Sequence, residues 1–167
     1  MIKMIWAQTQ EGVIGDKNRL PWRIPEEMAH FQNTTKNKTI LMGRNTFESL
    51  GNKPLKNRFN YVLTSTLPPS VPEPLKNLQF IDNISAVVSL FAHSRNQDLY
   101  VIGGNQVFAT FLPYADQVIR TTIFHPYQGS LKIVPLDLSE FQLARTIKKP
   151  EFKIEYLERI NHHHGQR

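Results

Sequence analysis

The feature of this sequence that most constrains its fold is an alternation of short apolar, β-prone runs with segments of helical spacing. Turn or polar residues bound each run, which predicts strands at residues 4–7, 39–42, 61–64, 78–81, 99–102 and 118–124. The intervening segments 25–34 and 84–92 are predicted helices, the first because it starts with Pro25 and two carboxylates. Such alternation is typical of an α/β fold with a largely parallel central sheet.

Two longer runs near the C-terminus, 141–148 and 153–160, suggest a closing antiparallel pair. The predicted fold is therefore a three-layer α/β sandwich with a mixed, mostly parallel sheet and an antiparallel C-terminal strand. A chain of 167 residues suits one domain, which we assign to residues 1–160. The proline-rich stretch 67–74 is expected to be a stiff surface loop, and the tail 161–167 is a frayed end or an added segment without assigned function.

Composition excludes several classes of protein. The chain has no cysteine, so disulfides, thiolate nucleophiles and Cys-type zinc sites are ruled out, and we expect no metal site. No apolar run is long enough to cross a bilayer, which makes a cytoplasmic protein without membrane contact the simplest expectation. The net charge of +6 would suit nucleic acid or a small polyanion, but the basic residues are scattered and no nucleic-acid motif accompanies them.

The loop from Gly12 to Trp22 is the first candidate for function. Its glycines and polar residues follow a predicted strand, as in lids that exclude water from a bound substrate, although an ordinary surface turn would read the same way. Just beyond it, Glu27 and Phe31 lie four residues apart on one face of the predicted helix. A carboxylate beside an apolar stripe would have a raised pKa suited to binding a protonatable heterocycle, whereas the simpler alternative is stabilisation of the helix dipole.

Two glycine turns are candidate binding sites for an anionic ligand. One follows the strand that ends at Met42 and carries Gly43 and Arg44 before a predicted helix at 47–50, while the other carries Gly103 and Gly104 before a predicted helix at 106–112. Neither turn matches the Rossmann fingerprint or a P-loop, and each turn alone is weak evidence for such a binding site.

Taken in order along nearly the whole chain, these segments resemble the bacterial, chromosomal type of dihydrofolate reductase. The resemblance rests on Trp6-Ala7, Gly12 to Gly15, Leu20-Pro21-Trp22, Glu27, Phe31, Met42-Gly43-Arg44, Phe47-Glu48-Ser49, Pro54-Leu55, Arg58 and Val101-Ile102-Gly103-Gly104. It implies an eight-stranded, mostly parallel sheet with four flanking helices, and an oxidoreductase of one-carbon metabolism. In such enzymes NADPH reduces 7,8-dihydrofolate to 5,6,7,8-tetrahydrofolate, with hydride transfer to pterin C6 and protonation at N5.

The resemblance also implies roles for residues. The catalytic group would be Glu27, which pairs with the pterin 2-amino group and N3, together with Trp22 and Thr121. Because that end of the pterin is far from N5, the proton would arrive through water. Arg58 would hold the glutamate tail with its forked guanidinium. The full substrate-binding set is Ile5, Trp6, Ala7, Leu20, Glu27, Met28, Phe31, Leu50, Leu55, Arg58, Ile102, Phe108 and Thr121.

The cofactor set implied by the resemblance combines both glycine turns with a hydroxyl cluster for the 2′-phosphate, a pattern that favours NADPH over NADH. It comprises Ala7, Ile14, Gly15, Gly43, Arg44, Asn45, Thr46, Leu63, Thr64, Ser65, Ile102, Gly103, Gly104, Asn105, Gln106, Val107 and Phe108. A monomer is expected, with dihydrofolate as substrate, antifolates such as methotrexate or trimethoprim as inhibitors, and no nucleic acid as partner.

The sequence departs from the family pattern at two places. Gly129 is followed by Ser130 and Leu131 where the family commonly has Asp-Thr, so we expect altered anchoring of that loop. Position 27 is Glu where many bacterial relatives have Asp. The nearest alternative is another NADPH reductase of related fold, such as the pyrimidine reductase of riboflavin synthesis, but Glu27 and Arg58 fit a pterin-glutamate ligand better.

Overall fold

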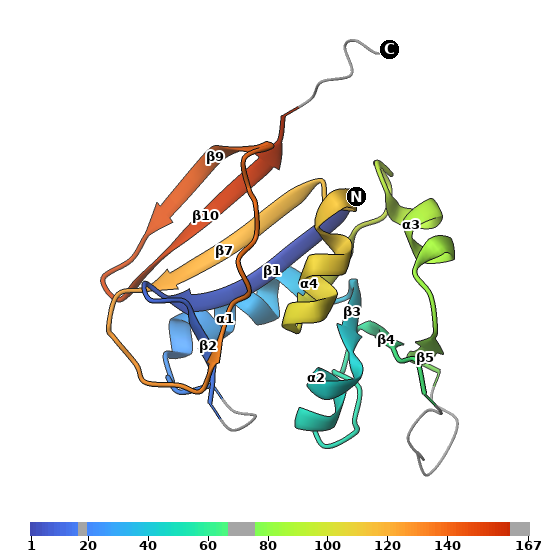
Figure 1. Ribbon diagram of the computed structural model, residues 1–167, viewed down its shortest axis with the longest axis horizontal. Helices are drawn as coiled ribbons and strands as arrows, with labels where there is room; N and C mark the ends of the chain where they lie inside the picture. The colour runs from blue at the N-terminus through green and yellow to red at the C-terminus, as the bar shows by residue number, and fades with distance from the viewer. Residues whose placement is uncertain (17–19, 67–75, 161–167) are drawn as a thin grey trace.

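The computed structural model describes residues 1–16, 20–66 and 76–160. Part of the predicted lid loop, the proline-rich stretch and the tail 161–167 lie outside these residues. The central feature is an eight-stranded sheet with the order β5-β4-β3-β6-β1-β7-β10-β9 (Figure 1). Its strands are β1 (Ile2–Thr9), β3 (Thr39–Gly43), β4 (Phe59–Leu63), β5 (Leu78–Ile81), β6 (Leu99–Gly103), β7 (Gln117–Ile123), β9 (Phe141–Lys148) and β10 (Phe152–Arg159).

The strand directions confirm the predicted mixed sheet. Strands β5, β4, β3, β6, β1 and β7 pair in parallel, and β10 runs antiparallel to both β7 and β9. The central strand β1 is apolar and lies between β6 and β7, as expected for a strand that is covered on both faces. The carboxyl ends of the parallel strands therefore meet at one edge of the sheet.

Four helices complete the three layers, namely α1 (Pro25–Thr35), α2 (Arg44–Ser49), α3 (Ser85–Phe91) and α4 (Asn105–Phe111). Two apolar clusters divide the side chains between the faces of the sheet. Phe47 of α2 packs in one cluster with Ile5 of β1, whereas Phe108 of α4 packs in the other with Met4. Neighbouring residues of a strand point to opposite faces, so β1 contributes to both cores.

A second, two-stranded sheet was not predicted. It pairs β2 (Val13–Gly15) with β8 (Leu131–Lys132) in antiparallel fashion, and the Ile133 amide donates to the Gly12 carbonyl over 2.8 Å. Strands of two or three residues are too short to show an alternating pattern. Part of the predicted lid loop is therefore strand, tied to the loop that carries Ser130.

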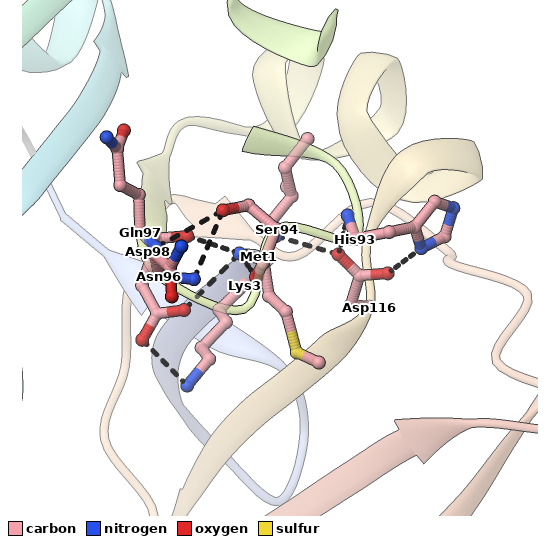
Figure 2. A network of polar contacts seen from close by, with 9 residues as sticks. Met1, Lys3, His93, Ser94, Asn96, Gln97, Asp98 and Asp116 are labelled. Atoms are coloured by element: carbon pink, nitrogen blue, oxygen red, sulfur yellow. Dashed lines mark hydrogen bonds and ion pairs between the residues drawn. The ribbon is translucent and has the colours of Figure 1, made fainter. Parts of the chain in front are cut away.

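Polar contacts fasten the start of β1 to the segment after α3 (Figure 2). The Asp116 carboxylate accepts the Ile2 amide at 2.8 Å and lies 2.8 Å from His93 Nδ1, while Asp98 pairs with Lys3 Nζ at 3.3 Å. These contacts lie away from the carboxyl ends of the parallel strands and serve the fold. In the described part of the chain, no helix has the length and apolar character that a bilayer crossing requires.

Candidate active site

Glu27 lies in the first turn of α1 and is 5% exposed. The Trp22 indole Nε1 donates a hydrogen bond of 3.1 Å to its Oε1 atom. Burial raises the pKa of the Glu27 carboxyl above its ordinary value of 4.5, and the bond from Trp22 lowers it in part. Its burial distinguishes Glu27 from Glu26, which lies in the same turn but is exposed and pairs with Lys149. Glu27 is therefore equipped to bind a ligand group that can share a proton.

An apolar wall adjoins this acid. Trp22 and Ile5 belong to one buried cluster, against which several partly buried side chains pack, among them Ala7, Phe31, Leu55 and Ile102. All six were predicted site residues. Three more predicted contacts are exposed apolar side chains, with exposed fractions of 54% for Leu20, 44% for Met28 and 36% for Leu50. Exposed apolar side chains of this kind are what a flat heteroaromatic ligand would cover.

Thr121 is buried on β7, directly opposite Ala7 of β1 in the sheet register. Among the described residues, the hydrogen-bond donor recorded to the Glu27 carboxylate is Trp22, so the predicted pairing of Thr121 with Glu27 stays a prediction.

The structure does not bring the side chains of Trp6 and Phe108 to the apolar wall. Their rings pack on each other with centroids 5.2 Å apart, inside the cluster on the opposite face of the sheet. The reason is the alternation of β1, since Ile5, Trp6 and Ala7 cannot all face one side of the sheet.

Arg58 directly precedes β4, and its buried side chain packs against the end of α1, where neighbouring groups fix its guanidinium. Its Nε donates to Thr35 Oγ1 over 2.9 Å, Nη1 donates to the Lys56 carbonyl over 2.7 Å, and Nη2 donates to Gln32 Oε1. The group also lies 5.9 Å from the centroid of the Phe31 ring. Burial lowers the pKa of the Arg58 guanidinium, which still remains protonated at neutral pH.

Sequence reasoning missed the residue that holds this region in place. Asn60 is fully buried on β4; its Oδ1 accepts the Leu55 amide, and its Nδ2 donates to the carbonyls of Leu55, Arg58 and Asn77. An asparagine inside an apolar strand pattern was the available signal, because a buried amide must find several partners.

A cavity of about 440 Å³ opens at the carboxyl ends of β3, β4 and β6. Its lining includes eleven predicted cofactor residues: Gly43, Arg44, Asn45, Thr46, Leu63, Thr64, Ser65, Gly104, Asn105, Gln106 and Val107. Close packing here requires Gly43, because a Cβ atom at this position would lie 2.8 Å from Val107 Cγ2. Both glycine turns therefore meet at one pocket, as predicted.

The remaining predicted cofactor residues lie outside this pocket. Gly103 precedes it with a φ of +127°, joined to Gly104 by a cis peptide bond, and the Phe108 ring packs beneath Gly103. Ile14 and Gly15 belong to β2, while Ala7 and Ile102 pack against the apolar wall next to Glu27. Their assignment to the cofactor stays a prediction.

Three residues line the cavity without having been predicted: Thr66, Asp82 and Thr110. Asp82 follows β5 directly and Thr66 closely follows β4, so their positions at strand ends were readable from the sequence. Thr110 lies one turn beyond Gln106 on α4, and its hydroxyl donates to the Gln106 carbonyl over 2.9 Å.

Comparison with known proteins agrees with this geometry. A family model described as dihydrofolate reductase matches residues 1–161. The dihydrofolate reductase of Mycoplasma pneumoniae is 37% identical over 161 residues, covering 96% of this chain and 99% of that protein. That of Ureaplasma parvum is 37% identical over 156 residues, covering 93% and 96%.

A solved structure of Enterococcus faecalis dihydrofolate reductase, in complex with NADP(H) and RAB-propyl, superposes with a TM-score of 0.79. The two sequences are 28% identical, and the match covers 95% of this chain and 96% of that one. The family model and the relatives both extend over the buried acid and the glycine-lined pocket. The chain belongs to the dihydrofolate reductase family.

Proposed function

We propose that the region around Glu27 binds the pterin substrate and that the cavity beside Arg44 binds the cofactor of this enzyme. The protein is an NADPH-dependent reductase that converts 7,8-dihydrofolate to 5,6,7,8-tetrahydrofolate. Bound NADPH supplies the hydride, which passes from nicotinamide C4 to pterin C6. The observation that carries the site assignment is the buried Glu27 carboxylate, bonded to Trp22 and bordered by apolar side chains.

Glu27 orients the pterin by accepting hydrogen bonds from its 2-amino group and N3, and Thr121 completes this end of the site. A raised pKa lets the carboxyl share a proton with the heterocycle near neutral pH. Trp22 holds the carboxylate in one orientation. The proton that N5 receives comes through water, because N5 lies at the other end of the ring system from this contact.

The substrate's rings pack against the apolar wall and its exposed rim, namely Ile5, Ala7, Met28, Phe31, Leu50 and Leu55, with Leu20 covering them. Arg58 binds the α-carboxylate of the glutamate tail through two N–H groups. Gln32 is the exposed partner that this carboxylate displaces from the guanidinium. Thr35 and the Lys56 carbonyl keep the Arg58 guanidinium oriented while the carboxylate binds.

The donor set of the cavity fits a cofactor that carries phosphates. Arg44, Thr64 and Ser65 would hold the 2′-phosphate, and Thr46 with the backbone from Gly103 to Val107 would hold the pyrophosphate. The glycines allow the cofactor to approach the backbone closely. Ile14 and Ile102 flank the nicotinamide in this assignment.

As a dihydrofolate reductase, the protein binds its small-molecule substrate and antifolate inhibitors. We assign methotrexate and trimethoprim to the substrate side of the site, because diaminopyrimidine and diaminopteridine rings present a protonatable face to Glu27. Residues 1–160 form the catalytic domain in this proposal, and the protein works in the cytoplasm as a monomer.

The decisive experiment compares Glu27→Gln with Glu26→Gln. NADPH oxidation with dihydrofolate should fall by about a hundredfold or more in Glu27→Gln, because the amide cannot supply the shared proton. Glu26 is exposed and pairs with Lys149, so its variant should keep the wild-type rate. Both variants should bind NADPH with the wild-type dissociation constant. Near-wild-type turnover of Glu27→Gln would overturn the assigned role.

A further inference from the structure

The cofactor cavity contains an acidic residue, Asp82, that the proposed NADPH contacts do not use. We infer that the enzyme also accepts NADH, and that Asp82 sets the ratio between the two cofactors by accepting a hydrogen bond from the adenosine 2′-hydroxyl. This inference rests on the proposed placement of the adenosine phosphate beside Arg44.

The sheet register places Asp82 next to the hydroxyl cluster. Strands β4 and β5 pair in parallel with Leu63 opposite Ile81, and the Thr64 amide donates to the Ile81 carbonyl over 2.9 Å. Asp82 and Thr64 therefore leave adjacent strands at the same edge of the sheet. On the other side, Arg44 Nη1 lies 3.4 Å from Thr64 Oγ1. Thr64 thus contacts the guanidinium, and Asp82 follows the neighbouring strand β5, which lies beside β4 in Figure 1.

Carboxylates outnumber basic groups among the described residues around this point. Arg44 is the basic residue among the described residues that line the cavity, and its Nε is paired with Glu48 Oε2 at 3.1 Å. Asp82 adds a second carboxylate, whose Oδ1 accepts an exposed hydrogen bond from Asn83 Nδ2 at 3.2 Å. A 2′-phosphate carries about −1.5 to −2 charges near neutral pH. It therefore meets one guanidinium offset by two carboxylates, which reduces the electrostatic advantage of NADPH.

The same groups suit the 2′-hydroxyl of NADH. In dinucleotide sites a carboxylate accepts the ribose 2′-hydroxyl of NAD, whereas an arginine accommodates the 2′-phosphate of NADP. This cavity offers both, and the Thr64 and Thr66 hydroxyls can bond to either group because a hydroxyl both donates and accepts. The cavity can therefore hold either cofactor in one position.

The reaction with NADH is balanced in the same way as that with NADPH. The C4–H bond of the nicotinamide breaks as its hydride forms the new C6–H bond of the pterin, and a proton from water bonds to N5. NADH is oxidised to NAD⁺ and dihydrofolate is reduced to tetrahydrofolate. The nicotinamide halves of the two cofactors are identical, so the difference between them falls on binding at the adenosine end.

The test measures kcat/KM for NADPH and NADH, at saturating dihydrofolate, in the full-length protein. The variants are Asp82→Asn, which removes the charge and keeps an acceptor, Asp82→Ala, which removes both, and Glu158→Gln as a control. Glu158 is an exposed carboxylate on β10, so its variant changes the net charge equally at a distant site. Isothermal titration with NADP⁺ and NAD⁺ gives the binding constants without turnover.

We expect wild-type kcat/KM for NADH to lie within about a hundredfold of that for NADPH, the size of one charge-assisted contact. Asp82→Asn should raise the NADPH-to-NADH ratio by about three- to tenfold, mainly through tighter NADP⁺ binding, and added salt should shrink that gain. Asp82→Ala should also weaken NAD⁺ binding. Glu158→Gln should leave the ratio unchanged.

The inference would be overturned if the wild-type enzyme preferred NADPH over NADH by more than about a hundredfold in kcat/KM. It would also be overturned if the NADPH-to-NADH ratio of both Asp82 variants equalled that of Glu158→Gln. The proposed function fails separately, if NADPH itself supports no reduction of dihydrofolate. If NADPH supports turnover but the Asp82 variants leave the NADPH-to-NADH ratio unchanged, the proposed function stands and the role of Asp82 is wrong.

Discussion

The Trp22 indole and the Glu27 carboxylate form a buried hydrogen bond of 3.1 Å between the loop that precedes α1 and the first turn of that helix. Burial raises the pKa of Glu27 and this bond lowers it, so Trp22 moderates an acid that would otherwise hold its proton more strongly. Trp22 also packs in the apolar cluster that forms the wall of the site. The residue therefore links the loop to the ionisation of the acid.

Replacing Trp22 with Phe should keep most of the packing and remove the hydrogen bond. The pKa of Glu27 should then rise further, because the contribution that lowers it is lost. One limb of the pH dependence of kcat/KM for dihydrofolate reports the ionisation of Glu27. That limb should move to higher pH, and turnover at neutral pH should fall about tenfold. Trp6→Phe is the control, since Trp6 Nε1 donates to Gln8 on the other face of the sheet. An unmoved limb in Trp22→Phe would contradict this account.

Glu27→Gln should stabilise the unliganded protein near neutral pH while it abolishes turnover. The folded-state pKa is raised above 4.5, so the unfolded state loses its proton first as the pH increases, and folding stability falls until the folded-state pKa is passed. The amide avoids this cost and can still accept the Trp22 bond. Thermal unfolding should show Glu27→Gln more stable than wild type at about pH 7 and equal to it at about pH 4. A variant less stable than wild type at neutral pH would show that the carboxylate is not penalised.

Arg58→Leu should raise the KM for dihydrofolate by about ten- to a hundredfold with little change in kcat, because the contact lies far from the reacting carbons. Arg58→Lys should not restore affinity, since an ammonium cannot reproduce the fork that Thr35 and the Lys56 carbonyl hold in place. A dihydropterin substrate without the glutamate supplies the control. If Arg58→Leu weakened that substrate equally, the loss would come from the fold instead of the tail contact.

The sheet and its helices could be predicted because their signals are local. The strand 78–81 was predicted with its observed bounds, and the helix predicted at 25–34 extends by one residue. The helix α2 was predicted only from Phe47, yet it begins at Arg44, because its first turn carries the polar residues of the cofactor cavity. The sheet of β2 and β8 escaped detection because its strands are too short for any periodic signal.

Residue type was enough to single out an acid that proves to be buried, Glu27, and two glycine turns that line one cavity. Residue type could not give the direction of a side chain, as for Trp6, whose ring packs in the cluster on the opposite face of the sheet from Ile5. Asp82 and Asn60 were missed for a different reason. Each lies beside a predicted strand, so its position was readable, but its neighbours belong to other segments that a linear reading of the sequence cannot place together.

Gly43→Ala tests how closely the two glycine turns pack. The added Cβ would lie 2.8 Å from Val107 Cγ2, so α2 and α4 must separate at the cofactor cavity. We expect a loss of about 1–3 kcal/mol in the free energy of unfolding and weaker NADPH binding. Val107→Ala removes the clashing methyl groups, and the double variant should recover much of both losses. Additive losses in the double variant would place the strain elsewhere.

The loop around Ser130 lacks the acidic side chain that the family commonly has there, and the structure supplies one from the opposite strand. The Ser130 amide donates to Asp16 Oδ1 over 3.1 Å, just beyond β2. Gly129 lies so close to β2 that a Cβ atom would be 2.5 Å from both the Gly15 carbonyl oxygen and Val13 Cγ1. In this chain, Asp16 and the close approach of Gly129 therefore hold β8 against β2.

Gly129→Ala should accordingly push β8 away from β2, which carries Ile14 and Gly15 beside the proposed nicotinamide position. Single-turnover hydride transfer should slow by about tenfold, because a small displacement of groups that position the reactants is costly. Asp16→Ala should slow the same step less, by the loss of one hydrogen bond, and Asp16→Asn should remain near wild type because its Oδ1 can still accept the Ser130 amide. Equal rates in Gly129→Ala and wild type would mean that the pairing of β2 with β8 does not position the cofactor.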